Sequence, residues 1–483
     1  MDLDQSKTPL FDAVKKYVDD KVIQFHVPGH KQGRGLPEFR DYIGEKVLQM
    51  DVNGMDDLDY LNNPTGVILE SQRLLANAFN ADEAFFLVNG TTAGVQAMIM
   101  SVLNPRDKII LPRNAHKSAV GGIILSNAIP VYVQPEINQQ VGIAMGVTVE
   151  SIKRAIKENP DAKAVFLINP TYYGAASDLK SIVRIAHSNG MIVLVDEAHG
   201  SHMHFHNDFP LTAMEVGADM SALSIHKTAG SLTQSSVLLV KGKKVNLERV
   251  KQILNLMATS SASYLLMCSL DIARKQLALK GYEMLDKTIE LARFARDNIN
   301  KISGLICPGK ELVGTPGCFD FDETKLGVYV RDLGLSGYQL EKKLRKGYNI
   351  QVELSDLYNI LSIITLGDRK KDIEALVAAL DDIASKSDIN KYEGVNIIPE
   401  TPKVVIPPRE AFYSNKMAVD LDASLGKISG EIVTVYPPGI PLVCPGEEIS
   451  KEIIEFIKIL KSQNCEIQGP SDPSMDTIKI VEK

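Results

Sequence analysis

Two short stretches in the middle of the chain place reactive side chains directly after apolar runs. Asp196 follows the run 191–195, and Lys227 follows the run 219–225 among small and polar residues. Runs of this length, bounded by glycine or polar turns, are typical of buried strands rather than helices. Because ligands of α/β sheets bind at strand ends, the sequence predicts a carboxylate and an amine nucleophile at two such ends.

A carboxylate and an amine in these positions are what a pyridoxal phosphate enzyme requires. The lysine amine bonds covalently to the cofactor aldehyde, and the carboxylate keeps the pyridine nitrogen protonated, so that the ring can accept electrons from a substrate. Taken singly, an aspartate after a strand is more often a helix cap or turn residue, and a lysine in a polar loop is more often solvated. The hypothesis therefore needs a phosphate site as well.

The segment Asn89-Gly-Thr-Thr-Ala-Gly94 offers such a phosphate site. It lies between a predicted strand, 84–88, and a predicted helix, 95–103. Glycines, hydroxyls and free backbone N–H groups at the start of a helix form a cradle for phosphate. The same residues also form an ordinary helix N-cap, so both interpretations stay open at this point.

Predicted strands and helices alternate through the region that carries these motifs. The predicted strands are 84–88, 109–111, 131–133, 164–168, 191–195, 219–225 and 236–240, with helices that include 149–157 and 179–188 between them. This alternation predicts an α/β fold with a largely parallel sheet covered on both faces. Strand 236–240 is expected to complete the sheet as an antiparallel edge.

The N-terminal residues 1–20 are predicted to form an amphipathic helix. Leu10, Val14, Tyr17 and Val18 fall on one face at helical spacing. Such a helix packs either on a partner subunit or on its own domain, and the spacing does not choose between them.

Beyond the main region, the sequence predicts smaller units. A long helix, 264–302, leads to a run of strands and two helices that fits an α+β domain, and a polar linker follows at 386–402. Four prolines within 433–448 are expected to exclude a central strand or a helix there. The predicted domains are an N-terminal segment, a large cofactor-binding domain, a small α+β domain and a C-terminal subdomain, at residues 1–60, 61–303, 304–390 and 403–483.

The composition is that of an ordinary globular protein. The 483 residues are 45% hydrophobic and 23% charged with a formal net charge of −7, and this mildly acidic balance argues against nucleic acid as the main partner. The five cysteines form no CxxC pair, which suits a reducing compartment. The N-terminus lacks the apolar core of a secretory signal, and no apolar run approaches the ~20 residues of a membrane helix. We therefore expect a cytoplasmic protein without a membrane partner.

Six motifs together resemble the bacterial Orn/Lys/Arg decarboxylases of pyridoxal-phosphate fold type I. The resemblance spans nearly the whole chain in the family order and is closest to the short arginine decarboxylases, which lack an N-terminal wing domain. The motifs are Phe25-His-x-Pro-Gly-His30-Lys, Asn89-Gly-Thr-Thr92, Arg113-Asn-x-His116-Lys-Ser, Asp196-Glu-Ala-His199-Gly, Ser224-x-His226-Lys227 and Tyr436-Pro-Pro-Gly-x-Pro-Leu-x-x-Pro-Gly446-Glu447.

The resemblance implies both a fold and a reaction. The implied fold is an α/β, aspartate aminotransferase-like large domain with a mostly parallel sheet, followed by smaller α+β C-terminal domains. The implied reaction is the pyridoxal-phosphate-dependent decarboxylation of a basic amino acid, with L-arginine, giving agmatine and carbon dioxide for polyamine biosynthesis, preferred over lysine or ornithine. A homodimer or higher homo-oligomer is also implied, because the family builds each site from two subunits.

The resemblance also implies roles for individual residues. Lys227 corresponds to the lysine that holds the cofactor covalently, Asp196 to the partner of the pyridine nitrogen and His116 to the imidazole stacked on the ring. Either Lys227 or His226 returns a proton to the α-carbon, and the sequence does not choose between them. The remaining cofactor contacts implied by the motifs are Thr91, Thr92, Ser224, His226, Ala198 and His199. His199 stands where the larger enzymes have tryptophan, and this chain contains no tryptophan.

The distal cation of the substrate requires carboxylates. Glu447, in the Pro-Gly-Glu turn, is one candidate, and Asp57 is a second. For each of them an exposed turn residue is an equally good interpretation. The polar segment 56–64 is a few residues longer than the family pattern, which leaves its substrate role open.

The sequence allows three other interpretations. His199, His202, His204 and His206 alternate in a way that can chelate a metal, but no cysteine or second ligand pattern accompanies them, and no metal is expected. An aminotransferase or β-lyase of the same fold type would hold the substrate carboxylate with an arginine such as Arg331 or Arg345. A catalytically silent scaffold is disfavoured, because every chemical position is intact.

Overall fold

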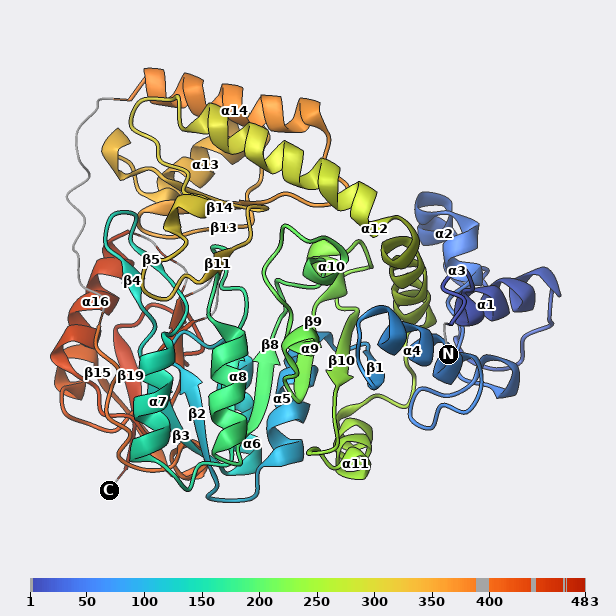
Figure 1. The fold of residues 1–483 in the computed structure, drawn as a ribbon, viewed down its shortest axis with the longest axis horizontal. Helices are drawn as coiled ribbons and strands as arrows, with labels where there is room; N and C mark the ends of the chain where they lie inside the picture. The colour runs from blue at the N-terminus through green and yellow to red at the C-terminus, as the bar shows by residue number, and fades with distance from the viewer. Residues whose placement is uncertain (1–2, 388–398, 436–439, 464, 466, 483) are drawn as a thin grey trace. The chain divides into compact units, whose positions relative to one another are not determined.

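The structure of the chain is a computed structural model that describes residues 3–387, 399–435, 440–463, 465 and 467–482. The chain divides into two compact units (Figure 1). Unit 1 comprises residues 1–101 and 194–286, and unit 2 comprises residues 102–193 and 287–483. Most of the predicted linker and the Tyr436-Pro-Pro-Gly part of the sixth motif lie outside the described residues. The domain boundaries expected from the sequence stay a prediction.

Unit 1 holds the N-terminal helices and four strands of the main sheet. Its helices and helical turns are α1 (Pro9–Asp19), α2 (Pro37–Ile43), α3 (Glu45–Gln49), η1 (Asp56–Leu58), α4 (Val67–Ala78), α5 (Gly90–Val102), η2 (Met203–Phe205), α9 (Ala213–Val216), α10 (Ile225–Thr228), α11 (Leu247–Met257) and the first part of α12 (Tyr264–Ile299). Its strands are β1 (Glu83–Leu87), the last part of β8 (Ile192–Asp196), β9 (Met220–Leu223) and β10 (Ser236–Val240).

The strands of unit 1 hydrogen-bond in the order β1-β10-β9-β8. Strands β8 and β9 run parallel, whereas β10 is antiparallel to both of its neighbours, β9 and β1. The antiparallel direction of β10 was predicted, but its place at the edge was wrong, because β1 pairs along its other side. Every residue of β9 and β10 is buried, in keeping with sequences that are apolar except for Ser221 and Ser236.

The stretch 219–225 differs from the prediction of one continuous strand. Strand β9 ends at Leu223, and the chain turns at Ser224 into the short helix α10, which carries Lys227. The N–H group of Lys227 donates to the carbonyl of Ser224, 3.1 Å away, and this bond closes the helical turn. The lysine therefore projects from a helical turn after the strand rather than from the strand end itself.

Unit 2 combines a parallel sheet with several smaller sheets. Its helices and helical turns are α6 (Lys117–Ser126), α7 (Val149–Glu158), α8 (Leu179–Ser188), the last part of α12, η3 (Lys310–Leu312), η4 (Arg331–Leu333), α13 (Gly337–Gly347), α14 (Lys370–Ser385), α15 (Pro408–Tyr413), η5 (Leu421–Ser424) and α16 (Lys451–Ser462). Its strands are β2 (Lys108–Pro112), β3 (Ile129–Val133), β4 (Ile137–Asn138), β5 (Ile143–Ala144), β6 (Ala164–Ile168), β7 (Ala175–Ala176), β11 (Asp320–Phe321), β12 (Lys325–Tyr329), β13 (Leu354–Ser355), β14 (Asn359–Ile363), β15 (Lys416–Asp420), β16 (Val433–Val435), β17 (Ile440–Val443), β18 (Ile467–Gln468) and β19 (Thr477–Val481).

The sheets of unit 2 confirm the predicted α/β class. Strands β3, β2 and β6 run parallel in that order, and helices α6, α7 and α8 alternate with strands along this part of the chain. The predicted α+β region forms the antiparallel sheet β12-β14-β13, on which α13 and α14 lie (Figure 1). One apolar core joins that sheet to its helices through residues such as Val328, Leu340 and Leu380.

The proline-rich C-terminal stretch forms more strand than expected. Strand β16 is the central strand of the sheet β17-β16-β18, although no central strand was predicted in 433–448. The prediction was wrong because the four prolines all follow β16. Pro441 lies in β17, an edge strand, where the missing N–H group costs no ladder hydrogen bond.

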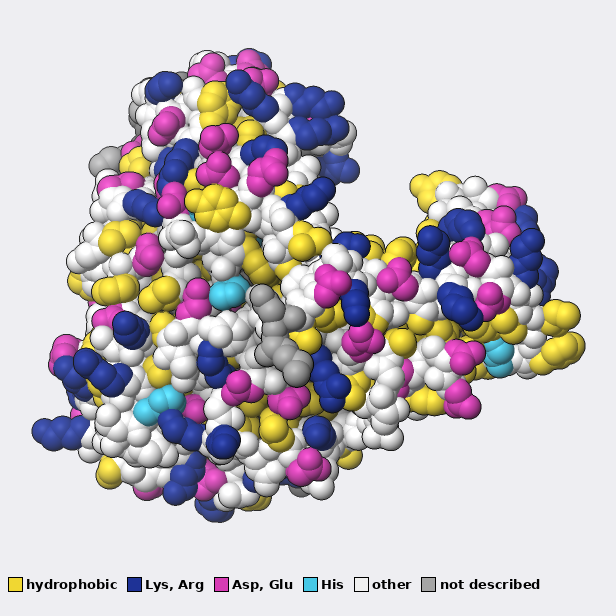
Figure 2. Space-filling model, turned by 45° about the vertical axis from the view of Figure 1, so that its right-hand side comes forward, with side chains coloured by type: hydrophobic (Ala, Val, Ile, Leu, Met, Phe, Trp, Pro, Cys, Tyr) yellow, Lys and Arg dark blue, Asp and Glu magenta, His cyan; other side chains and the backbone are white. Residues whose placement is uncertain are grey.

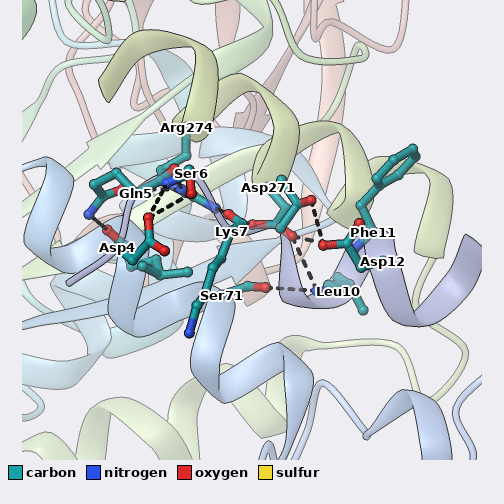
Figure 3. Close-up of polar contacts among 12 residues, drawn as sticks. Asp4, Gln5, Ser6, Lys7, Leu10, Phe11, Asp12, Ser71, Asp271 and Arg274 are labelled. Carbon is teal, nitrogen blue, oxygen red and sulfur yellow. Dashed lines mark hydrogen bonds and ion pairs between the residues drawn. The ribbon is translucent and has the colours of Figure 1, made fainter. Parts of the chain in front are cut away.

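The N-terminal helix α1 packs on its own unit through a buried ion pair (Figure 3). Its apolar face of Leu10, Val14, Tyr17 and Val18 is buried as the spacing predicted. Asp271 of α12 accepts the N–H groups of Leu10 and Phe11 at the first turn of α1, at 3.2 and 3.3 Å. An acidic group in this position satisfies first-turn donors and opposes the positive end of the helix dipole.

Arg274 completes this anchor one turn further along α12. It donates to the carboxylate of Asp271 at 2.7 Å and to the backbone carbonyls of Gln5 and Lys7 at 2.7 and 2.6 Å. The side chains of Asp271 and Arg274 are both fully buried. Replacing only one of the two residues would therefore leave the other as a buried charge with neither an opposite charge nor water beside it.

We expect Arg274→Met to lower the free energy of unfolding by about 3–5 kcal/mol, the usual cost of stranding one member of a buried ion pair. The matched control is Lys16→Met, which removes an exposed pair with Asp20 on α1 and should cost less than ~1 kcal/mol. Urea unfolding of both variants measures the difference. Equal small losses would show that the anchor contributes little.

Candidate active site

Asp196 is the last residue of strand β8, and its side chain is buried. The N–H group of Ala198 donates to its Oδ1 at 3.0 Å. Burial raises the pKa of Asp196 above its ordinary value, and the Ala198 N–H group and the charge of Lys227 offset only part of that shift. A carboxylate in this setting is stabilised by a cationic N–H partner, which is what a protonated pyridine nitrogen offers.

Buried hydroxyl groups stabilise the turn that carries Lys227. Ser201 donates to the carbonyl of Ser224 at 3.1 Å, and its hydroxyl lies 2.7 Å from that of Thr228. The Nζ of Lys227 lies 2.8 Å from the Nε2 of His199. Because an ammonium group only donates, Nε2 of His199 accepts this bond, and a neutral His199 carries its proton on Nδ1.

Thr91 and Ser224, two predicted phosphate contacts from distant parts of the chain, lie together in unit 1. Their hydroxyl oxygens are 2.6 Å apart, and Thr91 also donates to the hydroxyl of Ser236 at 3.0 Å. Helix α5 begins at Gly90, whose positive φ of 70° suits glycine, rather than at residue 95 as predicted. Thr91 and Thr92 therefore lie in its first turn, with Thr92 exposed.

These groups fit pyridoxal phosphate by the chemistry of their donors and acceptors. The first N–H groups of a 13-residue helix have no partner within the helix, and they stand beside the Thr91 and Ser224 hydroxyls. Such a helix start binds a phosphate dianion. Lys227 supplies an amine for the cofactor aldehyde, and Asp196 supplies the anion for its ring nitrogen. Unit 1 thus holds residues for three parts of the cofactor.

His226 and His116 are each fixed by a backbone contact. The Nδ1 of His226 lies 2.9 Å from the carbonyl of Ser235, which only accepts, so Nδ1 carries the proton of this bond. His116 lies in unit 2 as the N-cap residue of α6, where its Nδ1 accepts the N–H group of Ser118 at 3.2 Å. Its place against the cofactor ring stays a prediction from the resemblance.

The two substrate candidates lie in different settings. Asp57 is exposed in the turn η1 of unit 1. Glu447, by contrast, is fully buried in unit 2, where both of its carboxylate oxygens are bonded to Arg113. The alternative interpretation of Glu447 as an exposed turn residue is therefore wrong, and its carboxylate has a cationic partner within the chain. A substrate role for Glu447 stays untested.

The four alternating histidines separate in the structure. His199 contacts Lys227, whereas the ring of His202 packs edge-on against Phe209 with centroids 4.5 Å apart. His204 lies 3.2 Å from a carboxylate oxygen of Glu215. His206 packs on the ring of Tyr282 with centroids 4.3 Å apart. Within the described part of the chain, no three His, Cys, Asp or Glu side chains gather as metal ligands.

Glu197 is a buried carboxylate that the sequence analysis missed. It accepts the Ser221 hydroxyl at 2.6 Å and the N–H group of Ala213 at 2.8 Å. Burial raises the pKa of Glu197 to about 8, against the smaller opposing effect of the Ser221 and Ala213 hydrogen bonds. Its position directly after Asp196 is the one feature of the sequence that could have pointed to Glu197. The hydroxyl groups of Ser201 and Ser236 were also missed, and no feature of the sequence pointed to them.

Comparison with known proteins identifies similar sequences along the whole chain. Two family models match, described as Orn/Lys/Arg decarboxylase, major domain, over residues 8–327 and Orn/Lys/Arg decarboxylase, C-terminal domain, over residues 395–470. The chain is 47% identical over 485 residues to an arginine decarboxylase of Bacillus subtilis (strain 168), covering 100% of this chain and 99% of the relative. It is 46% identical over 483 residues to an arginine decarboxylase of Halalkalibacterium halodurans, covering 99% of this chain and 98% of the relative.

A solved structure shares the fold. The lysine decarboxylase of Francisella novicida superposes with a TM-score of 0.86 at 21% sequence identity, over 98% of this chain and 81% of that chain. At this level of identity the similarity concerns the fold alone. The α/β architecture with small C-terminal sheets is therefore confirmed.

We expect the stability of the protein to depend on Glu197 between about pH 4.5 and about pH 8. In this window the native state keeps a proton that the unfolded chain releases, so the contribution of Glu197 to stability falls as the pH rises through it. Glu197→Gln removes this dependence, and the difference between the two proteins should reach a few kcal/mol, at roughly 1.4 kcal/mol per pKa unit. Urea unfolding across the window measures it, and parallel curves would contradict the expected titration.

Proposed function

Because this chain belongs to the Orn/Lys/Arg decarboxylase family, we propose that it converts L-arginine into agmatine and carbon dioxide with pyridoxal phosphate as its cofactor. The observation that carries the proposal is the pair of Lys227 and Asp196 in one compact unit, electrostatically coupled, beside the Thr91 and Ser224 hydroxyls. Arginine is preferred over lysine and ornithine because full-length relatives at 46 and 47% identity are arginine decarboxylases.

Each residue of the site has a task in this reaction. When bound, pyridoxal phosphate supplies a ring that accepts the electrons released as carbon dioxide leaves the α-carbon. Lys227 would hold the cofactor at its aldehyde through the side-chain amine. Asp196 would stabilise a proton on the pyridine nitrogen, which would keep the ring electron-poor. The Thr91 and Ser224 hydroxyls and the first turn of α5 would hold the phosphate.

The reaction is completed by proton transfer and orientation. Loss of carbon dioxide leaves the α-carbon one proton short, and Lys227 or His226 supplies it. His199 holds the amine of Lys227 through the 2.8 Å contact and takes the place of the tryptophan in the larger enzymes. His116 provides the imidazole for the ring face. Ala198 contributes its N–H group to Asp196, which orients the carboxylate.

An aminotransferase finds no support in the described structure. The guanidinium of Arg331 lies over the ring of Tyr358, 5.5 Å from its centroid. Arg345 is exposed on α13 and hydrogen-bonds the side chain of Asn349. Both arginines therefore have partners of their own within unit 2, and we expect no keto-acid product.

The protein is further proposed to act in the cytoplasm, in polyamine biosynthesis. Among the described residues, no helix combines the length and apolar character needed to cross a bilayer. Basic and acidic side chains are interspersed on the face shown in Figure 2 rather than gathered by sign. Together with the acidic net charge of −7, this distribution gives nucleic acid no extended basic surface on that face.

The function is tested by the amine product. Purified protein loaded with pyridoxal phosphate is incubated separately with L-arginine, L-lysine and L-ornithine, and we expect agmatine from arginine as the main product. Lys227→Ala should abolish turnover, whereas Lys280→Ala, an exposed lysine of the same unit, should retain it. Cadaverine or putrescine as the main product would move the assignment to lysine or ornithine, and a keto acid would move it to transamination.

A homodimer is proposed from the resemblance and from apolar exposure in unit 1. Between α1 and α3, Ile23, Phe25 and Tyr42 are 82, 95 and 90% exposed. Apolar side chains exposed together in one segment are typical of interaction surfaces. The segment also contains the Phe25 motif of the family, so a second copy of this chain is the proposed partner.

We expect light scattering to give about twice the chain mass of 53.0 kDa. Phe25→Asp should shift the protein toward the monomer at low concentration, because it buries a charge in the contact. Tyr413→Asp, at a 68% exposed site in unit 2, is the matched control and should leave the mass unchanged. A wild-type monomer at all concentrations would contradict the dimer.

A further inference from the structure

A buried ion pair joins two distant parts of unit 2. Arg113 follows strand β2, and Glu447 lies 334 residues further along in the C-terminal subdomain, residues 403–483. The guanidinium donates to the two carboxylate oxygens at 2.6 and 2.9 Å. The side chains of Arg113 and Glu447 are only 9 and 1% exposed. A two-point contact of this kind sets the direction of the arginine as well as its distance.

Further contacts hold both members of the pair in place. Its guanidinium also donates to the carbonyl of Leu442 at 2.9 Å and lies over the ring of Tyr132, 4.7 Å from the centroid. Glu447 accepts the N–H group of Cys444 at 2.7 Å, which fixes the carboxylate within the C-terminal subdomain. The pair is therefore held from both sides.

Only two residues separate Arg113 from His116. The backbone N–H group of Arg113 donates to the carbonyl of Val133 at 2.9 Å, and Asn114 and Ala115 are buried. His116 then caps helix α6 through the N–H group of Ser118. A connection this short and this well packed limits how far His116 can move independently of Arg113.

The C-terminal subdomain also holds the far end of helix α6. Arg409 of α15 donates to the carbonyls of Leu125 and Ile124 at 2.7 and 3.3 Å. These carbonyls belong to the last turn of α6, where a cation satisfies free acceptors and the negative end of the helix dipole. The segment that carries His116 is therefore held at both ends by one subdomain.

We propose that Glu447 is a positioning residue that sets the imidazole of His116 through Arg113, and that the C-terminal subdomain is the clamp that orients this part of the site. The inference rests on the proposed function insofar as His116 serves the cofactor. It gives Glu447 a task other than binding the substrate cation. Without the carboxylate, Arg113 is left as a buried unpaired cation and leaves its position, and the segment through His116 follows.

The first measurement follows the backbone. We expect Glu447→Gln to raise amide hydrogen exchange at residues 114–118 about tenfold or more in the cofactor-free protein, since breaking a buried pair frees its local structure. Arg409→Gln, a half-buried position that spares the pair, should raise exchange in the last turn of α6 by about twofold. Asp322→Asn disrupts another buried pair of unit 2, with Lys325, and should leave residues 114–118 unchanged.

The second measurement is a double-mutant cycle on the dissociation constant of pyridoxal phosphate. Glu447→Gln should weaken binding of the cofactor by about fivefold to tenfold in the wild-type background. In the His116→Ala background the same substitution should have no further effect, because the group through which Glu447 acts is gone. Arg113→Lys, which keeps the charge but loses the two-point contact, should behave like Glu447→Gln.

The outcomes separate this inference from the proposed function. Wild-type exchange and cofactor affinity in Glu447→Gln, or equal weakening in both backgrounds, would overturn the positioning role even in an active decarboxylase. Should Glu447→Gln fail to fold, unchanged exchange in α6 of Arg409→Gln would overturn the clamp. Absence of any amine product from the wild type would contradict the proposed function, while the exchange measurement would still decide the role of Glu447.

Discussion

The buried carboxylate of Asp196 is the constraint on which the rest of the site depends. A charge removed from water must meet an opposite charge or hydrogen-bond donors, and within unit 1 Asp196 has the Ala198 N–H group and the influence of Lys227. Burial also raises the pKa of the neighbouring carboxyl group, Glu197, to about 8. Burial therefore raises the pKa of both adjacent acids, and at Asp196 the charge of Lys227 is among the effects that oppose the shift.

Small hydroxyl side chains make the hydrogen bonds that hold this site together. The Ser201, Ser224 and Thr228 hydroxyls and carbonyls close around the turn of Lys227, and Thr91 reaches the same region from α5. Small side chains of this kind lose little rotamer freedom on burial. They fix the lysine turn and the phosphate loop against one another at little entropic cost.

How far the sequence predicts the structure depends on the range of the interaction. The apolar runs in the sequence were sufficient to predict strands β8 and β10, because the burial of a strand shows in its local sequence pattern. The helical turn at Lys227 escaped prediction, since four residues are too few to show a helical period. The partner of Glu447 lies 334 residues away, and no local pattern reports a contact of that range. The phosphate loop could be proposed from the sequence because its glycine and hydroxyl residues are themselves the groups that bind phosphate, and this role stays a prediction.

The anchor of helix α1 determines which substitutions the N-terminal arm can accept during evolution. Asp271 and Arg274 contact the N-terminal arm mainly through peptide groups, at the amides of Leu10 and Phe11 and the carbonyls of Gln5 and Lys7. Peptide groups are common to nearly all residue types, so the arm is free to vary in its side chains while the anchor persists. Proline alone is excluded at the two amide positions, because it has no N–H group to donate.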